Sequence, residues 1–268
     1  MRLGRVAAAI VVASCGTLLV GPIAPARAAV DGSRIGYFQS TVTGSINQRL
    51  TVTAMCPAGQ KVVSLGAFGT HITSLRPTTN FDGAVASGVA TNGTSLSAVA
   101  GCVRAEVVQD VTQITLRVRS RTVGLRQDVQ SCPAGRFAFG GGGGFTGSPS
   151  GGMSVSRVTP DGRGWAFAGF VDVASATTEI DVQCAPDDGT TFLVTATAFS
   201  SGAGFKTAEA VCPEPYFAFS GGAQVLGSNG TPADFPIVES QPGSRASWRV
   251  TGIPPAGGSI VAVARCIL

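Results

Sequence analysis

The chain has 268 residues, of which 44% are hydrophobic and only 13% are charged, with a formal net charge of +4. This composition is too apolar for a disordered chain, and 37 glycines suit short strands joined by many turns. The chain has one histidine and no closely spaced cysteine pair, which argues against the usual zinc sites, and we predict no metal site.

The first 28 residues have the pattern of a secretory signal peptide. Arg2 and Arg5 precede an apolar run over residues 6–20, and residues 26–28 match an A-x-A cleavage site. Lipoprotein-type cleavage at Cys15 is the alternative, and it is less favoured because the apolar run continues past that cysteine. Cleavage after residue 28 removes three arginines and no acid, so the formal charge becomes 16 − 15 = +1. We expect a secreted, extracellular protein with no membrane insertion and no nucleic-acid partner.

Three copies of a Cys-Pro segment then recur at regular intervals. They begin at Cys56, Cys132 and Cys212, and a second cysteine closes a β-like run about fifty residues after each, at positions 102, 184 and 266. The intervals are 76 and 80 residues in the first set of cysteines and 82 and 82 in the second. Such regularity indicates an internal repeat. We place the repeats at residues 29–108, 109–190 and 191–268.

The six cysteines of the mature chain predict a disulfide framework. Six cysteines allow fifteen pairings, and the repeat selects the one in which equivalent units close equivalent loops. The predicted disulfides are Cys56–Cys102, Cys132–Cys184 and Cys212–Cys266. Each closes a loop of about fifty residues, worth about 4 kcal/mol in the chain-entropy model.

Alternation of polar and apolar residues predicts strands through most of each repeat. It is clear in residues 50–53, 114–119 and 192–199, and in closing strands over 96–102, 178–184 and 260–266. We expect about six strands per repeat, and each Cys-Pro step should lie at a strand end or a sheet edge. The predicted fold is all-β, with three homologous antiparallel repeats packed together, either β-prism-like or as tandem small β-sandwiches.

The pattern Cys-Pro-x-Gly, a Gly-Gly step, a Pro turn, Trp and a closing cysteine resembles a repeat of secreted actinobacterial proteins of unassigned function. The segment Cys132–Gly140 is also similar to the repeats of the vitelline membrane outer layer protein family. That second, weaker likeness implies a threefold β-prism and a carbohydrate-related role. The repeats here are longer, and the acidic signature of that family is absent, so no site residue is carried over.

The other candidate motifs have simpler structural explanations. Residues 140–144 are all glycine, but no Gly-Lys-Ser/Thr opens a helix after them, so we interpret Gly66, Gly142 and Gly222 as points of close backbone approach. His71, the only histidine, would have to be the base of a hydrolase triad, but the chain has no recognisable nucleophile motif. We interpret Asp172, Glu179 and Asp181 as part of a solvated polar face and not as the carboxylate pair of a glycosidase. A calcium site at residues 186–189 has no more support than a glycosidase pair, because the EF-hand pattern is absent. We therefore predict no catalytic residues, no cofactor and no enzyme activity.

The aromatic residues are the best candidates for binding. Tyr37, Trp165, Tyr216 and Trp248 could stack on sugars, whereas the alternating context of Trp165 favours a core tryptophan near the disulfide. Two functions stay open: a binding protein for cell-wall or extracellular carbohydrate, and a protein-interaction subunit, adaptor or inhibitor in a secreted assembly. The expected partner is accordingly an extracellular glycan or a secreted protein.

Overall fold

The computed structural model describes residues 34–91, 94–108, 110–148, 151–187, 193–202 and 204–268, so the predicted signal peptide lies outside the described residues. This part of the chain forms eighteen strands and one 3-10 helix, η2 (Ala105–Val108), and it contains no helix long and apolar enough to cross a bilayer. The strands of repeat 1 are β1 (Gly36–Thr43), β2 (Arg49–Met55), β3 (Gln60–Phe68), β4 (His71–Pro77), β5 (Gly83–Val89) and β6 (Ser95–Arg104). Those of repeat 2 are β7 (Thr112–Arg119), β8 (Gly124–Ser131), β9 (Arg136–Thr146), β10 (Met153–Val158), β11 (Gly164–Val171) and β12 (Thr177–Pro186). Those of repeat 3 are β13 (Leu193–Ser201), β14 (Lys206–Val211), β15 (Phe217–Leu226), β16 (Ile237–Ser244), β17 (Ser247–Gly252) and β18 (Ser259–Ile267).

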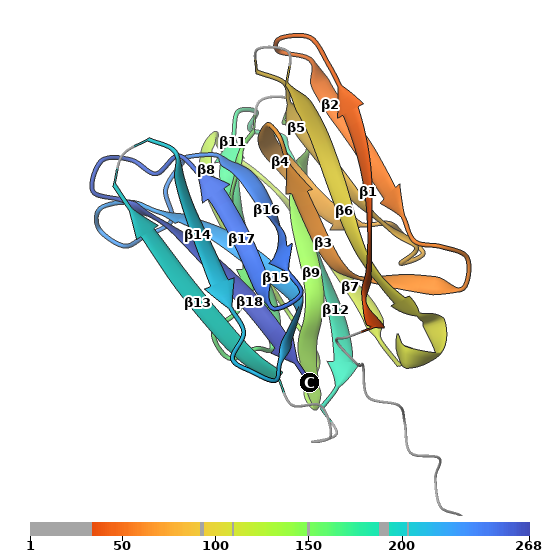
Figure 1. The fold of residues 1–268 in the computed structure, drawn as a ribbon. Helices are drawn as coiled ribbons and strands as arrows, with labels where there is room; N and C mark the ends of the chain where they lie inside the picture. The colour runs from red at the N-terminus through yellow and green to blue at the C-terminus, as the bar shows by residue number, and fades with distance from the viewer. Residues whose placement is uncertain (1–33, 92–93, 109, 149–150, 188–192, 203) are drawn as a thin grey trace, which may run out of the picture.

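The strands form three six-stranded antiparallel sheets, each shared by two repeats (Figure 1). Sheet A has the order β1-β6-β3-β16-β17-β14, sheet B has β2-β5-β4-β9-β12-β7, and sheet C has β13-β18-β15-β10-β11-β8. Each sheet therefore joins the first, sixth and third strands of one repeat to the fourth, fifth and second strands of another. The all-β prediction and the six strands per repeat are confirmed, and the three repeats form one connected structure.

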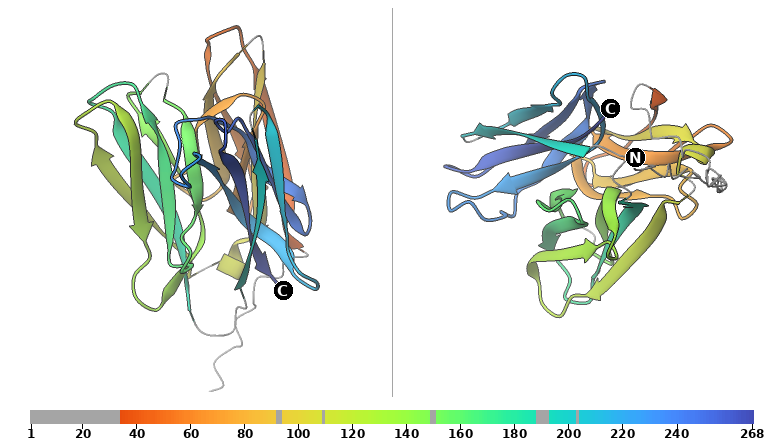
Figure 2. Two further views of the ribbon diagram at one scale, coloured as in Figure 1. Left: turned by 90° about the vertical axis from the view of Figure 1, so that its left-hand side faces the viewer. Right: turned by 90° about the horizontal axis from the view of Figure 1, so that it is seen from below.

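Within each repeat the two three-stranded halves pack face to face. In repeat 3, for example, β17 and β14 of sheet A contact β18 of sheet C. Seen from below, the repeats form three groups of strands around a common centre, coloured orange to yellow, green and blue (Figure 2). Each group is thus a small sandwich, and the six-stranded sheets run from one sandwich to the next.

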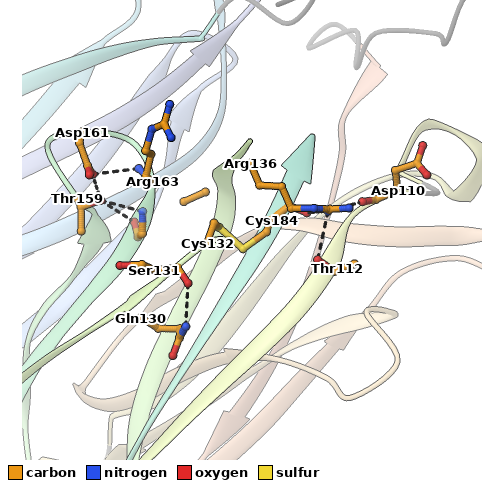
Figure 3. Close-up of a disulfide and its surroundings, with 12 residues drawn as sticks. Asp110, Thr112, Gln130, Ser131, Cys132, Arg136, Thr159, Asp161, Arg163 and Cys184 are labelled. Carbon is orange, nitrogen blue, oxygen red and sulfur yellow. Dashed lines mark hydrogen bonds between the residues drawn. A yellow bond between two sulfur atoms is a disulfide. The ribbon is translucent and has the colours of Figure 1, made fainter. Parts of the chain in front are cut away.

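The three predicted disulfides are present, with sequence separations of 46, 52 and 54 residues. Each joins the residue after the second strand to the sixth strand, and so connects two different sheets within its repeat. The Cys-Pro steps directly follow β2, β8 and β14, which are edge strands, as expected. Beside the Cys132–Cys184 disulfide, the Arg136 guanidinium donates to the carbonyl of Cys184 at 2.8 Å and the carbonyl of Asp110 at 2.9 Å (Figure 3).

The sheets cross repeat boundaries through short ladders between third and fourth strands. These ladders pair β4 with β9, β10 with β15 and β16 with β3. A Cβ atom on Gly142 would lie 2.0 Å from the carbonyl oxygen of Leu75, and one on Gly222 would lie 2.4 Å from that of Ser156. At Gly66 the corresponding neighbour is Gln241 Cβ at 3.0 Å. The predicted close backbone approach is confirmed, and it occurs where one repeat joins the next.

A small apolar cluster lies where the three repeats meet. Each third strand has a bulge, and the bulged residues Val63, Phe139 and Phe219 are buried together with Val103, Ala185 and Ile267 from the sixth strands. The rings of Phe139 and Phe219 have centroids 4.8 Å apart. Burial of equivalent residues from all three repeats in one cluster makes the stability of each repeat depend on the others.

Carbonyl groups beside these bulges accept three equivalent hydrogen bonds that link the repeats in a ring. Gln183 Nε2 donates to Val62 at 3.0 Å, Arg265 Nη2 to Ala138 at 3.4 Å, and the Tyr37 hydroxyl to Ala218 at 3.0 Å. The donors come from repeats 2, 3 and 1, and the acceptors from repeats 1, 2 and 3. The equivalent carbonyl of each repeat thus accepts a hydrogen bond from a different kind of side chain: glutamine, arginine or tyrosine.

Candidate functional site

Both tryptophans are buried in the core. Trp165 is 2% exposed and Trp248 0%, and their indole N–H groups donate to Ser156 Oγ at 3.0 Å and Ser240 Oγ at 3.1 Å. A buried indole with a satisfied N–H is the expected state of a core tryptophan. Neither ring face reaches solvent, so burial favours the core interpretation over the sugar-binding one.

Each tryptophan lies against a glycine on the third strand of its own repeat. A Cβ atom on Gly141 would lie 2.6 Å from Trp165, and one on Gly221 would lie 2.1 Å from Trp248. In repeat 1 the strand register places Leu65 at the position of the glycine, Leu75 at that of the serine that binds the indole, and Ala84 at that of the tryptophan. All three residues are buried. Repeat 1 therefore fills the same space with two leucines and an alanine.

The two tyrosines are partly buried. The hydroxyl of Tyr37 is bound to Ala218, and burial raises its pKa to about 12 although a hydrogen bond with Ser64 opposes the shift. Tyr216 packs against the main core cluster. Tyr37 thus connects repeats 1 and 3, and the four predicted aromatics do not form one exposed platform.

Among the remaining polar candidates, Glu179 and Asp181 lie together on β12, where Arg76 binds both. Asp172 instead accepts a hydrogen bond from Ser148 Oγ. Burial lowers the pKa of His71, which lies far along the chain from these acids. Of the residues considered for calcium, Asp187 lies 3.7 Å from Arg163, and residues 188–189 are outside the described part.

The outer faces of the three sheets, which point away from the tryptophan core, carry different chemistry at equivalent positions. One register row across each sheet shows the difference. Sheet A has Thr207, Thr251, Glu239, Phe68, Ser97 and Thr41. Sheet B has Thr51, Ser87, Ser74, Gly144, Glu179 and Arg117. Sheet C has Gln127, Ala168, Val155, Gln224, Val261 and Phe199. The fold is threefold repeated, but its surface is not.

A depression of about 470 Å³ lies on the outer face of sheet A, where repeats 1 and 3 join. Its size falls within the range of small-ligand sites. Phe68 and His71 come from repeat 1, and Phe205, Glu239 and Arg249 from repeat 3. We call this depression the sheet A site.

A hydrogen-bonded carboxylate forms the polar wall of the sheet A site. Glu239 Oε1 accepts from Gln241 Nε2 at 2.7 Å and from Arg249 Nε at 2.8 Å, and Oε2 accepts from Thr251 Oγ1 at 2.7 Å. Burial by itself would raise the pKa of Glu239, but the hydrogen bonds from Thr251, Gln241 and Arg249 outweigh it and hold the pKa below its usual value. The carboxylate is therefore ionised and fixed in position at neutral pH.

Two phenyl rings complete the sheet A site. Phe205 is 70% exposed and Phe68 is half-buried. An exposed aromatic residue beside a fixed polar network combines an apolar contact surface with directional hydrogen bonding. The sequence did not indicate this site, because its residues are up to 181 positions apart (Phe68 to Arg249) and meet only through the β16–β3 ladder.

Comparison with known proteins gave no match to a family model and none to a curated protein.

Proposed function

We propose that this protein is a secreted, non-catalytic binding protein that recognises an extracellular glycan at the sheet A site. The observation that carries the proposal is the exposed ring of Phe205 next to the Glu239–Arg249–Gln241 network. A sugar ring has an apolar face of C–H groups and a rim of hydroxyls that both donate and accept hydrogen bonds. The phenyl ring suits the first, and the carboxylate, guanidinium and amide suit the second.

Several further features support this proposal. The three disulfides suit an oxidising, extracellular compartment. The preorganised network would lose little side-chain freedom on binding, which favours affinity in a small site. The likeness to the vitelline membrane outer layer family, whose role is related to carbohydrate, points in the same direction. We extend that likeness to a β-prism-like arrangement of the three sheets.

The test uses two phenylalanines of similar exposure. Phe205 in the site is 70% exposed, and Phe199 on the outer face of sheet C is 68% exposed. Affinity electrophoresis of the mature protein through gels containing neutral polysaccharides identifies a ligand, and calorimetry with oligosaccharides of that polymer gives the affinity. Loss of about 1–3 kcal/mol of binding free energy, or about fivefold to 150-fold in Kd, is expected for Phe205→Ala, by analogy with stacking on other ring ligands.

Phe199→Ala is the matched control and should bind like the wild type. The proposal is wrong if the two variants lose affinity equally, or if none of the neutral polysaccharides retards the wild-type protein.

A second candidate function, interaction with a secreted protein, is supported by the outer face of sheet C. On this face Phe199 is 68% exposed and Val129 is 45% exposed, and the strands between them carry a buried apolar cluster of Val155, Ala166 and Ala168. Exposed apolar groups gathered on one face are typical of protein-binding surfaces. Mass measurement of the protein in its native culture supernatant tests this function: a defined heteromeric complex that dissociates with Phe199→Ser supports it, and a monomer argues against it.

A further inference from the structure

The outer face of sheet B contains two adjoining hollows of about 660 and 500 Å³. Both are lined by Arg76, Pro77, Thr79 and Arg117, so they adjoin across the junction of repeats 1 and 2. We call the two hollows together the sheet B groove. Two adjoining hollows suit an extended ligand better than a single small molecule.

Arginine is concentrated in this groove. Arg49 on β2, Arg76 on β4 and Arg117 on β7 all line it. Arg119, two residues beyond Arg117 on the same strand, is exposed on the same face. The mature chain is almost neutral, so four guanidinium groups on one sheet face are a local excess of positive charge that no continuous segment of the sequence reveals.

The two acids of the groove are already bound at its floor. Asp181 is fully buried and accepts from Arg76 Nε at 2.6 Å, Gln113 Nε2 at 2.8 Å and Thr115 Oγ1 at 2.6 Å. Glu179 is 13% exposed and accepts from Arg117 Nε at 2.7 Å and from Arg76. These carboxylates hold Arg76 and Arg117 in place and neutralise two of the four charges.

The remaining guanidinium donors face the groove. The Arg117 side chain is 68% exposed and uses only Nε in its bond to Glu179, which leaves both Nη groups toward solvent. Exposed Arg49 donates from Nη2 to the carbonyl of Ser148 at 2.8 Å. Hydroxyls from Thr51 and Ser87, 3.0 Å apart, line the same hollow. The groove thus offers cationic donors beside neutral hydroxyl groups.

We propose that the sheet B groove is a second binding site, specific for an anionic carbohydrate polymer that carries carboxylate or phosphate groups along a hydroxyl-rich chain. Arginine matches both anions because its planar donors can make paired hydrogen bonds to two oxygens. Groups held by buried carboxylates are already oriented, which lowers the entropy cost of binding. Single-stranded nucleic acid fits less well, because the two phenylalanines that line the groove offer little stacking surface: Phe145 is 6% exposed, and Phe81 is partly buried against the core.

The proposal is independent of the sheet A site, because the two sites lie on different sheets and use different residues. It is tested by calorimetry of the whole mature protein with polygalacturonate as the carboxylate probe and poly(glycerol phosphate) as the phosphate probe. Dextran serves as the uncharged polymer. Binding at about 20 mM salt that weakens strongly at about 200 mM salt is expected for at least one polyanion, since exposed charges are screened over this range.

The decisive variant is the double substitution Arg49→Gln and Arg117→Gln. Both side chains are exposed, and Glu179 keeps its bond to Arg76, so the fold should be retained and circular dichroism will check it. We expect at least a tenfold loss of polyanion affinity. Arg104→Gln, whose side chain is 75% exposed on β6, removes one positive charge elsewhere, against two in the double variant, and its loss of binding free energy per charge removed should be much smaller.

Three results distinguish the outcomes. Selective loss with one polyanion identifies carboxylate or phosphate as the recognised group. Equal losses of binding free energy per charge removed for Arg104→Gln and the double variant would show only general charge attraction and would overturn the proposal. Absence of saturable wild-type binding to both polyanions at low salt would overturn it as well.

Discussion

Trp165→Ala tests the packing that connects the sequence repeat to the fold. The indole is 2% exposed, lies against Gly141 and donates to Ser156. Burial of about 200 Å² of aromatic surface at about 25 cal/mol per Å² contributes roughly 5 kcal/mol, of which alanine would keep a small part. The variant also leaves a cavity and a serine hydroxyl without its donor. We expect a loss of about 3–5 kcal/mol in the free energy of unfolding.

The residues of repeat 1 suggest a second variant that should restore the packing lost in Trp165→Ala. It has leucine, leucine and alanine at the positions of Gly141, Ser156 and Trp165, so the triple variant Gly141→Leu, Ser156→Leu, Trp165→Ala copies a combination that the fold already contains. Gly141→Leu alone should be strongly destabilising, because its Cβ would lie 2.6 Å from the indole. In the triple variant the leucines occupy the vacated space, but the backbone must still shift to relieve the 2.7 Å approach of the new Cβ to the carbonyl oxygen of Asp181. We therefore expect about half of the stability lost in Trp165→Ala to return.

The assay is urea unfolding of the oxidised protein, followed by far-ultraviolet circular dichroism because the variants change the fluorescence. The three positions are in contact, so their effects should be strongly non-additive. A loss below about 1 kcal/mol for Trp165→Ala would refute the proposed packing. A triple variant no more stable than the sum of its single substitutions would refute the equivalence of the three repeats.

Two further predictions concern the ring of hydrogen bonds between repeats. Tyr37→Phe should cost about 1–3 kcal/mol, measured by urea unfolding at pH 7, because the carbonyl of Ala218 loses its donor. In the folded protein the phenol of Tyr37 stays protonated until about pH 12, against an ordinary pKa of 10.0. The stability that its hydroxyl contributes is therefore complete below pH 10 and declines as the pH rises above 10. Over that interval the wild type should lose more stability than Tyr37→Phe. Arg265→Gln should be neutral or stabilising by roughly 1 kcal/mol, because Gln183 serves the equivalent carbonyl in another repeat without a buried charge. Burial lowers the pKa of Arg265 to about 10 and leaves its Nε without a hydrogen-bond partner. A clear loss of stability in Arg265→Gln, measured by urea unfolding, would contradict this explanation.

Local and periodic features were predictable from the sequence. Regular cysteine spacing predicted the disulfides because equivalent units close equivalent loops, and Pro57, Pro133 and Pro213 marked strand ends because proline lacks a ladder donor. The alternation around Trp165 correctly favoured its inward orientation. The glycines at 66, 142 and 222 were correctly interpreted as sites of close backbone approach.

Features that depend on pairing between repeats were not predictable. The β16–β3 ladder brings Phe68 next to Glu239, and no local pattern specifies which repeat supplies the neighbouring strand. Tyr37 looked like a binding residue because its acceptor, the carbonyl of Ala218, lies 181 positions away. Arg49 and Arg117 line the same hollow only because sheet B joins strands of repeat 1 to strands of repeat 2 through the β4–β9 ladder.

The most direct test of the proposed function is an NMR titration of the isotopically labelled mature protein with a neutral oligosaccharide derived from the polysaccharide selected by electrophoresis. Glycan binding at the sheet A site predicts saturable chemical-shift changes concentrated in Phe68–His71, Phe205 and Glu239–Thr251, with sheet C unchanged. Changes centred on any other face, or saturating shifts that persist unaltered in Phe205→Ala, would contradict it.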